Sequence, residues 1–239
     1  MANLHSIETM GLLDGPGIRT VFFLSGCPLR CLFCHNPDTQ NPSCGHPIST
    51  EQIVKRAIRM KPYFKNGGGV TLSGGEPMAN GKFLLETILA LKKEGIHVAV
   101  DTSGIGDGRY YEDIVNEADL ILLDIKHYDP IKFEEITGAK QDLLLEFITC
   151  IKNSDVRVWI RHVMMPGYTD SKEDMQKLVD FVRPIKKNID KLEILPYHTL
   201  GVEKYEELGI DYKLKGMSPM DKKIAKNLEN YANSVLNSD

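Results

Sequence analysis

Short strand-forming segments alternate with longer amphipathic segments along the chain, and this alternation limits the fold more than any other feature of the sequence. Strands separated by helices are joined by right-handed parallel crossovers. Parallel strands are covered on both faces, so they read as near-continuous apolar runs. The pattern predicts an α/β protein, built either as an open doubly wound sheet or as an incomplete barrel. The six predicted strands are Ile18–Leu24, Gly69–Ser73, His97–Asp101, Leu120–Ile125, Val156–Val163 and Lys191–Leu195.

The segments between the strands have apolar residues at the spacing of helices. Ser49 or Thr50 can cap the first of them, and Gly95 can end the second. The chain has 239 residues without a linker or a low-complexity tract, so we expect one domain over residues 1–239. The predicted helices are Ser49–Met60, Lys82–Lys93, Tyr110–Glu117, Pro130–Ile136, Leu143–Asn153, Ser171–Lys186 and Pro219–Val235.

Composition and charge exclude several classes of protein. Hydrophobic residues make up 42% and charged residues 26% of the chain, which are ordinary globular values and exclude a disordered or fibrous protein. With 29 Lys and Arg against 33 Asp and Glu, the net charge is −4, which argues against a nucleic-acid-binding protein. No stretch of about 18 apolar residues could span a membrane, and the first residues lack a signal-peptide pattern. We therefore expect a cytoplasmic protein that binds neither nucleic acid nor membrane.

Polar residues stand where the predicted strands end. The carboxyl ends of parallel strands share one edge of the sheet, where α/β proteins bind their ligands. Six strand ends that carry polar groups therefore predict a single site. These positions are Cys27, Gly74–Pro77, Asp101–Gly104, Asp124 with Lys126, Arg161 with His162, and Tyr197 with His198.

Three of the five cysteines, Cys27, Cys31 and Cys34, lie within eight residues and form a compact motif. Clustered cysteines in a reducing compartment indicate metal or redox chemistry rather than disulfides. Thiolates favour zinc or an iron–sulfur cluster. A four-iron cluster normally has four cysteine ligands, so three would leave one iron open for a substrate or cofactor.

A zinc site completed by His35 or His46 is the alternative, and it would make the protein a zinc-dependent enzyme or a zinc-stabilised binding module. No second Cys/His pair stands at the spacing of a zinc ribbon, which disfavours it. Cys44 follows Cys34 after a loop of nine residues and is a weaker candidate ligand. Cys150 lies in an apolar helical pattern and is expected in the core.

The cysteine motif, with an aromatic residue at Phe33, resembles the signature of the radical S-adenosylmethionine (radical SAM) enzymes. Gly74–Pro77, with the sequence GGEP, resembles the second motif of these enzymes, which cradles the methionine amino group. The two motifs follow the first two predicted strands. The resemblance implies a partial (β/α)6 barrel of the radical SAM type, in agreement with the six strand–helix units.

A narrower resemblance, to the enzymes that activate glycyl radical enzymes, extends over nearly the whole chain. Many of those relatives carry an inserted ferredoxin-like segment with additional cysteines after the first motif. Here only Asp38–Ile48 separates the motif from the next helix, which favours the pyruvate formate-lyase branch of the family. The matching segments are Asp14–Arg19, Gly26-Cys27, Cys34–Asp38, Lys93–His97, Asp101–Gly104, Leu123–Lys126, Val158–Arg161 and Leu195–His198.

The resemblance implies ligands and roles for residues of this chain. A [4Fe–4S] cluster would be held by the catalytic residues Cys27, Cys31 and Cys34, with S-adenosylmethionine at the open iron. The implied cofactor-binding residues are Phe33, Cys34, His35, Gly74, Gly75, Glu76, Asp124, Ile125, Lys126, Arg161 and His198. A monovalent cation would be held by Asp101, Thr102 and Asp124. The protein substrate would contact Asp14, Arg19 and His35.

Several of these roles have particular physical reasons or a second interpretation. Gly75 is expected to let the backbone approach the methionine moiety closely, as only glycine allows. Glu76 could instead orient the glycine turn without touching a ligand. Arg161 could pair with an acidic strand end, and Arg19 could form a structural ion pair.

In this family, a reduced cluster donates an electron to the sulfonium of S-adenosylmethionine, and the resulting 5′-deoxyadenosyl radical removes a hydrogen atom from a glycine of the protein substrate. The resemblance thus implies pyruvate formate-lyase as that substrate, in anaerobic glucose metabolism. It also implies flavodoxin or ferredoxin as the electron donor. We expect a monomer. Two alternatives for the substrate stay open: another glycyl radical enzyme, or a small molecule.

Overall fold

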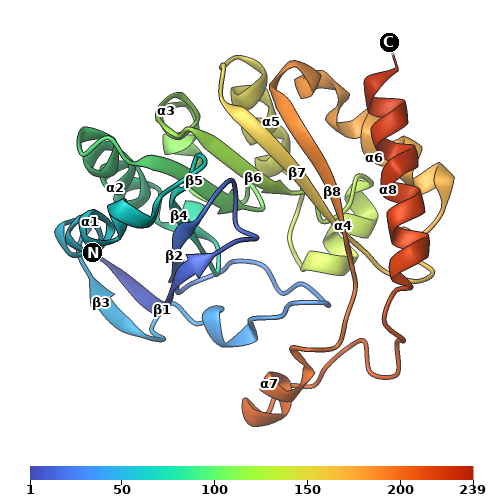
Figure 1. Ribbon diagram of the computed structural model, residues 1–239. Coiled ribbons are helices and arrows are strands. Elements are labelled where there is room, and N and C mark those ends of the chain that lie inside the picture. The colour runs from blue at the N-terminus through green and yellow to red at the C-terminus, as the bar shows by residue number, and fades with distance from the viewer. Residues whose placement is uncertain (239) are drawn as a thin grey trace.

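One eight-stranded sheet forms the centre of the protein (Figure 1). The structure, a computed structural model, describes residues 1–238. The strands are β1 (Ala2–Gly11), β2 (Arg19–Leu24), β3 (His46–Ile48), β4 (Gly69–Gly74), β5 (His97–Thr102), β6 (Leu120–Asp124), β7 (Arg157–Met164) and β8 (Ile189–Pro196). Their spatial order is β3-β1-β2-β4-β5-β6-β7-β8.

The six predicted strands correspond to β2 and β4–β8, which all run parallel. β1 pairs antiparallel with both β2 and β3. The strands β3 and β8 are the two edges, so the sheet stays open. The predicted α/β fold with a partial (β/α)6 barrel is therefore confirmed, with two antiparallel strands added beside β2.

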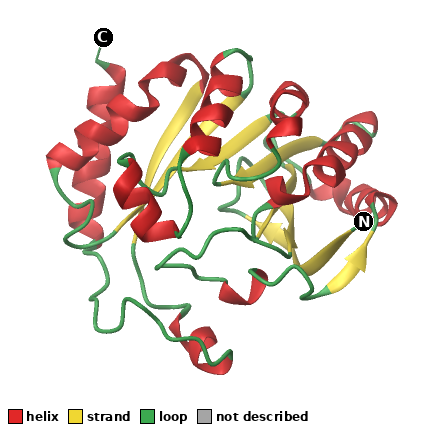
Figure 2. Cartoon of the chain, turned by 180° about the vertical axis from the view of Figure 1, so that it is seen from behind, coloured by secondary structure: helices red, strands yellow, loops and turns green. Residues whose placement is uncertain are grey.

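Most of the helices lie over one face of the sheet, as the view from behind shows (Figure 2). They are α1 (Thr50–Met60), α2 (Gly81–Lys93), α3 (Tyr111–Glu117), α4 (Pro130–Thr137), α5 (Asp142–Lys152), α6 (Lys172–Val182) and α8 (Lys222–Asn237). The short helix α7 (Val202–Glu207) lies away from the sheet, in the connection between β8 and α8. Ser49 caps α1, because its hydroxyl accepts from the backbone N–H of Gln52 while the Gln52 side chain accepts from the backbone N–H of Ser49. This reciprocal pair satisfies two donors at the helix start.

Some elements differ from the sequence prediction. The helix predicted to run to Lys186 ends at Val182 and continues as a 3-10 turn, Arg183–Asn188, because Pro184 has no N–H to extend the α-helical ladder. Two strands and one helix were not predicted. β1 mixes polar and apolar residues and is largely accessible, while β3 has three residues and α7 has six.

Alternation along the parallel strands separates two layers of side chains. On the face under the helices, the main core includes Val98, Val100, Ile121, Leu123, Val158 and Ile160. The opposite face, called the inner face below, carries a small apolar layer of Ala99, Leu120 and Leu122, against which Trp159 packs. Two residues further along each strand, this face carries Asp101, Asp124 and Arg161. The period of two thus places two acids and an arginine side by side at the carboxyl ends.

The connection between β1 and β2 projects in front of the inner face, in dark blue in Figure 1. A hydrogen bond holds the β1–β2 connection on the sheet: the Thr71 hydroxyl on β4 donates to the backbone carbonyl of Asp14 at 2.7 Å. Asp14 is thereby held over the inner face. None of the helices within residues 1–238 is long and apolar enough to cross a bilayer.

Candidate active site

A cavity of about 340 Å³ lies on the inner face at the carboxyl ends of the parallel strands. It combines the cysteine motif, the GGEP turn and the polar ends of β5, β6 and β7. The structure thus brings most of the predicted site residues together. They are Asp14, Cys27, Cys31, Phe33, Cys34, His35, Gly74, Gly75, Glu76, Asp101, Thr102, Asp124, Lys126 and Arg161.

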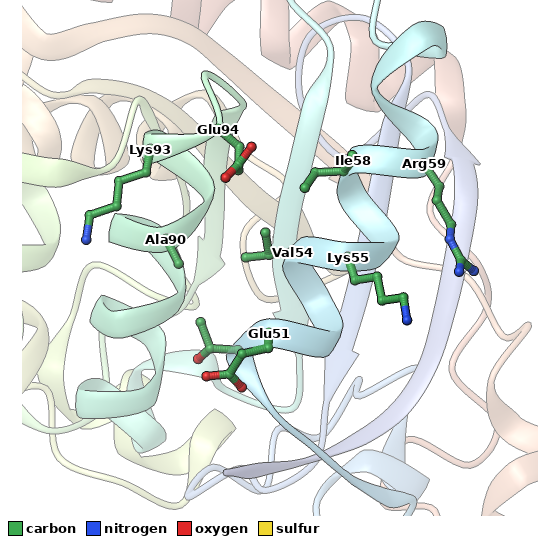
Figure 3. A pocket seen from close by; sticks show the side chains of 9 residues that line it. Glu51, Val54, Lys55, Ile58, Arg59, Ala90, Lys93 and Glu94 are labelled. Carbon is green, nitrogen blue, oxygen red and sulfur yellow. The ribbon is translucent and has the colours of Figure 1, made fainter.

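A larger hollow of about 510 Å³ lies on the outer surface between α1 and α2 (Figure 3). Val54, Ile58 and Ala90 form its apolar part, and charged side chains such as Lys55 and Glu94 surround them. None of the predicted site residues lines this hollow, and no buried polar groups converge in it. We therefore place the chemistry in the smaller cavity.

Backbone hydrogen bonds fix the loop that carries the cysteines. The N–H of Arg30 donates to the carbonyl of Thr137 at 2.7 Å, and the N–H of Leu32 donates to the carbonyl of Ile136 at 2.9 Å, both at the end of α4. Leu29 is buried beneath the loop. The protein itself therefore sets the backbone that presents the three sulfurs to the cavity.

The cysteine set suits a four-iron cluster. Burial raises the pKa of Cys27 to about 12 and that of Cys31 to about 11. Near neutral pH these thiols need the charge of a metal to become thiolates. Within residues 1–238, no three His, Cys, Asp or Glu side chains form a group that could hold one metal ion. In a cluster, each thiolate binds its own iron, so the sulfurs need not converge on one point.

The connection between β8 and α8 holds the segment that follows Cys34. The Tyr205 hydroxyl donates to the carbonyl of Cys34 at 2.9 Å. The Lys204 ammonium donates to Asn36 Oδ1 at 2.9 Å and to both Asp38 carboxylate oxygens at 3.2 Å. Sequence reasoning missed Lys204 and Tyr205, because they lie about 170 positions after the cysteine motif and no local pattern links them to it.

His35 and His198 form a stacked pair. Their ring centroids are 3.9 Å apart with an angle of 11° between the planes, and His35 Nε2 lies 3.1 Å from the carbonyl of His198. A carbonyl only accepts, so this nitrogen carries the proton. Burial, followed by the neighbouring His198, lowers the pKa of His35, which favours the neutral ring. His35 lines the cavity, whereas His198 supports it from outside the wall.

The GGEP turn brings the end of β4 against the end of β2. Gly74 has φ +118°, and a Cβ atom there would lie 2.2 Å from the backbone nitrogen of Leu24. A Cβ atom on Gly75 would lie 2.4 Å from the carbonyl oxygen of Gly26, next to the first cysteine. The predicted reason for Gly75 was close approach to a cofactor. The crowding in the structure comes from the chain's own backbone, which leaves no room for a side chain.

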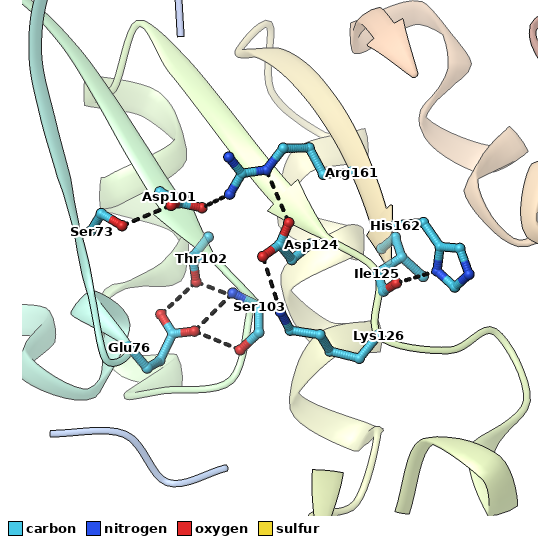
Figure 4. A network of polar contacts seen from close by, with 11 residues as sticks. Ser73, Glu76, Asp101, Thr102, Ser103, Asp124, Ile125, Lys126, Arg161 and His162 are labelled. Atoms are coloured by element: carbon cyan, nitrogen blue, oxygen red, sulfur yellow. Dashed lines mark hydrogen bonds and ion pairs between the residues drawn. The ribbon is translucent and has the colours of Figure 1, made fainter. Parts of the chain in front are cut away.

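Glu76 is fully enclosed and satisfied by the protein (Figure 4). Its carboxylate accepts from the hydroxyl of Thr102 at 2.6 Å, from the N–H and hydroxyl of Ser103 at 2.8 and 2.5 Å, and from the N–H of Met78 at 3.0 Å. Burial raises its pKa, and these hydrogen bonds oppose the rise. The geometry fits the second interpretation of Glu76, in which it orients the glycine turn.

Arg161 lies between the two inner-face carboxylates (Figure 4). Its guanidinium pairs with Asp101 and, at 3.0 Å, with Asp124. Lys126 Nζ lies 3.0 Å from the other oxygen of Asp124, and the Ser73 hydroxyl donates to Asp101 at 2.7 Å. Arg161 thus places a positive charge between Asp101 and Asp124, where the resemblance implies a monovalent cation. Ser73 was not among the predicted site residues.

The two carboxyl groups differ in their electrostatics. Burial would raise the pKa of Asp124, but the charges of Arg161 and Lys126 lower it to about 2. Burial dominates at Asp101 and raises its pKa, although Arg161 opposes this. Lys126 also lies over the ring of Phe33, 5.6 Å from its centroid, so a charge and an aromatic face border the same part of the cavity.

Besides His198, two predicted site residues lie away from the cavity wall. Arg19 is completely buried, and its guanidinium donates to Thr71 Oγ1 at 2.6 Å and to the carbonyl of Val70 at 2.5 Å. Arg19 therefore has a structural environment, as its second interpretation expects, but its hydrogen-bond partners are neutral oxygens rather than the carboxylate of an ion pair. Ile125 is also buried, and its carbonyl lies 2.7 Å from His162 Nδ1. It can therefore orient Asp124 and Lys126, its chain neighbours.

Replacing Arg161 with methionine is expected to lower the free energy of unfolding at pH 8 by about 3–5 kcal/mol, because it leaves the buried carboxylate of Asp101 without a charged partner and Asp124 with Lys126 alone. The pKa of Asp101 is raised whereas that of Asp124 is lowered, so Asp101 takes up a proton before Asp124 as the pH falls, and the deficit should be smaller at pH 5 than at pH 8. Anaerobic urea unfolding of the variant and the wild type at both pH values measures this loss of free energy. As a control, Arg157→Met removes an exposed pair with Asp190 and should cost at most about 1 kcal/mol. A deficit that does not change with pH would contradict the assigned network.

Comparison with known proteins places these features in context. Residues 21–182 match the Radical SAM superfamily. The pyruvate formate-lyase-activating enzyme of Clostridium pasteurianum is 49% identical over 237 residues, which cover 99% of this chain and 99% of that protein. The enzyme of the same name from Staphylococcus epidermidis is 43% identical over 241 residues, covering 97% and 95%.

Solved structures share the fold at lower identity. A domain of a pyruvate-formate lyase-activating enzyme from Bacteroides vulgatus has a TM-score of 0.57 and 21% identity, covering 71% of this chain and 95% of that one. Streptococcus suis SuiB bound to S-adenosylmethionine has a TM-score of 0.61 and 19% identity, covering 89% and 48%. At these identities, the likeness concerns the fold alone.

Proposed function

Because this chain belongs to the radical SAM superfamily, and within it to the pyruvate formate-lyase-activating enzymes, we propose that it generates the glycyl radical of pyruvate formate-lyase. The observation that carries this proposal is one cavity lined by both motifs, the three cysteines and the GGEP turn. The nearly complete alignment with relatives of that name supports the choice of protein substrate.

The cofactors of the superfamily are a [4Fe–4S] cluster and S-adenosylmethionine, which together supply the carbon radical that removes a hydrogen atom from glycine. The residues of this chain bind and orient them. Cys27, Cys31 and Cys34 would hold the cluster, and with three cysteine ligands one iron would stay available to S-adenosylmethionine. Lys126 offers a point charge to a carboxylate or ribose, and Phe33 offers an apolar face to the adenine.

The polar network prepares the rest of the cavity. Arg161 and Lys126 already balance the charges of Asp101 and Asp124, so the zwitterionic amino-acid end of S-adenosylmethionine can enter without disturbing the charge balance of these side chains. Asp14 and the neutral His35 stand on the wall beside it. We assign to them the contact with the glycine-bearing segment.

Partners and location complete the proposal. The cluster must be reduced before each turnover, so a one-electron carrier, flavodoxin or ferredoxin, is required. The product radical is sensitive to oxygen, which fits anaerobic glucose metabolism in the cytoplasm. We further propose that the protein acts as a monomer.

Electron paramagnetic resonance tests the function directly. Anaerobically purified protein, reconstituted with iron and sulfide and then reduced, should give a cluster signal that changes shape when S-adenosylmethionine is added. Addition of pyruvate formate-lyase should then produce the signal of a glycyl radical. A silent sample that holds one tightly bound zinc ion, or a responsive cluster that leaves pyruvate formate-lyase unmodified, would refute the proposal.

A further inference from the structure

The cavity is too small to admit a folded protein. At about 340 Å³, it lies at the lower end of the range for small-molecule sites. A protein substrate can therefore place only an extended glycine-bearing segment inside it. The rest of the partner must lie against the surface around the opening.

Large apolar side chains are exposed on one side of that opening. Leu12 and Leu13 stand at the tip of the β1–β2 hairpin and are 68% and 85% exposed. The next residue, Asp14, lies on the cavity wall. The hairpin is fixed, because the carbonyl of Asp14 is bonded to Thr71. These leucines are therefore held outward beside the cavity.

Another exposed leucine stands next to a different part of the wall. Leu200 is 84% exposed and follows the end of β8. The next residue, Gly201, lies so close to His35 that a Cβ atom there would be 2.8 Å from His35 Cα. His35 itself lines the cavity. Leu200 therefore borders the site from the side of the cysteine loop.

We propose that Leu12, Leu13 and Leu200, called the apolar rim below, contact the protein substrate on either side of its glycine-bearing segment. This inference rests on the proposed function, which makes a folded protein the substrate. The occupant is a protein surface with apolar side chains flanking an extended segment, and its contact with the apolar rim continues the contact made inside the cavity. Single exposed leucines are common, but these three stand within two residues of the cavity wall or next to a glycine packed against it, so a protein that enters the cavity must pass beside them.

The apolar rim contributes to recognition of the whole protein but has no role in the chemistry. None of its residues lies on the cavity wall, so cofactor binding and hydrogen abstraction do not need them. A short peptide with the glycine segment can enter the cavity beside the cofactors without covering the apolar rim. Intact pyruvate formate-lyase does both, so the two substrates should respond differently to changes in the apolar rim.

The test compares these two substrates with the variant Leu13→Ser/Leu200→Ser. For intact pyruvate formate-lyase, kcat/KM of glycyl radical formation should fall about tenfold, since contacts of this kind are worth on the order of one power of ten. For a synthetic peptide that carries the glycine segment, 5′-deoxyadenosine formation should change by less than about twofold. The cluster signal and its response to S-adenosylmethionine should be unchanged.

Ile131→Ser is the matched control. Ile131 is 76% exposed on α4, and it does not line the cavity. Both substrates should retain wild-type rates with this variant. Equal losses for protein and peptide in the rim variant, or no loss for the protein, would overturn the inference. If the wild type cleaves S-adenosylmethionine with the peptide but does not modify pyruvate formate-lyase, the proposed protein substrate is wrong and the apolar rim loses its occupant.

Discussion

We expect glycyl radical formation to be abolished when Cys31 is replaced by alanine. Cys31 is enclosed in the cavity wall, and burial raises the pKa of its thiol to about 11. Such a thiol stays protonated near neutral pH unless it binds a metal. Its loss leaves two cysteines of the motif, which are too few to retain a cluster of this kind. We expect iron content and the reduced-cluster signal to fall to background, with no 5′-deoxyadenosine formed.

Cys150→Ala is the matched control. Cys150 lies on α5 and packs against the main core, outside the cavity. Its replacement should leave iron content and the rate of radical formation within about twofold of the wild type. Should Cys31→Ala keep a cluster that still responds to S-adenosylmethionine, the ligand set is wrong, and Cys44 becomes the next ligand to examine.

The second large effect is expected at Gly74. Its φ of +118° is unfavourable for any residue with a Cβ atom, and that atom would lie 2.2 Å from the backbone nitrogen and oxygen of Leu24. Strain and overpacking together should cost about 4 kcal/mol. The ends of β2 and β4 must separate to relieve them. We therefore expect Gly74→Ala to lose stability in urea unfolding and to lose binding of S-adenosylmethionine, measured by isothermal titration.

Gly167→Ala separates backbone strain from crowding. Gly167 also has a positive φ, +75°, but a Cβ atom there would have no neighbour within 4 Å. The alanine should cost only about 1–2 kcal/mol and leave cofactor binding unchanged. If the two variants lose the same stability, the close approach of β2 and β4 is not what requires a glycine at position 74.

Much of the fold could be predicted because parallel strands have a strong sequence pattern. The segment that became β6 is apolar up to its last residue, Asp124, the segment that became β4 is buried along almost its whole length, and each is followed by a helix. β1 has no such pattern, because it pairs antiparallel near one edge and many of its side chains are accessible. Nothing in its ten residues favours a strand over a loop before the partner strands are known.

The site could be predicted in outline for a related reason. Polar residues at the ends of parallel strands must meet, so the motifs and Asp124 could be assigned to one place without coordinates. Pairing within the site depends on distances that sequence does not contain. Arg161 had two interpretations, and only the geometry joins it to both Asp101 and Asp124. The hydrogen bond from the Tyr205 hydroxyl to the carbonyl of Cys34 joins residues that are 171 positions apart, so no local sequence pattern predicts it.

The order of strands in the sheet bears on how the chain assembles. From β4 to β8, neighbours in the sheet are also neighbours in sequence, so a growing chain can add each strand to the free edge left by the preceding one. No strand has to be inserted between two that are already paired. Asp101 and Asp124 are then in place before β7 arrives with Arg161. Docking of β7 removes the two carboxylates from water, and this cost is compensated only in the register that places Arg161 between them.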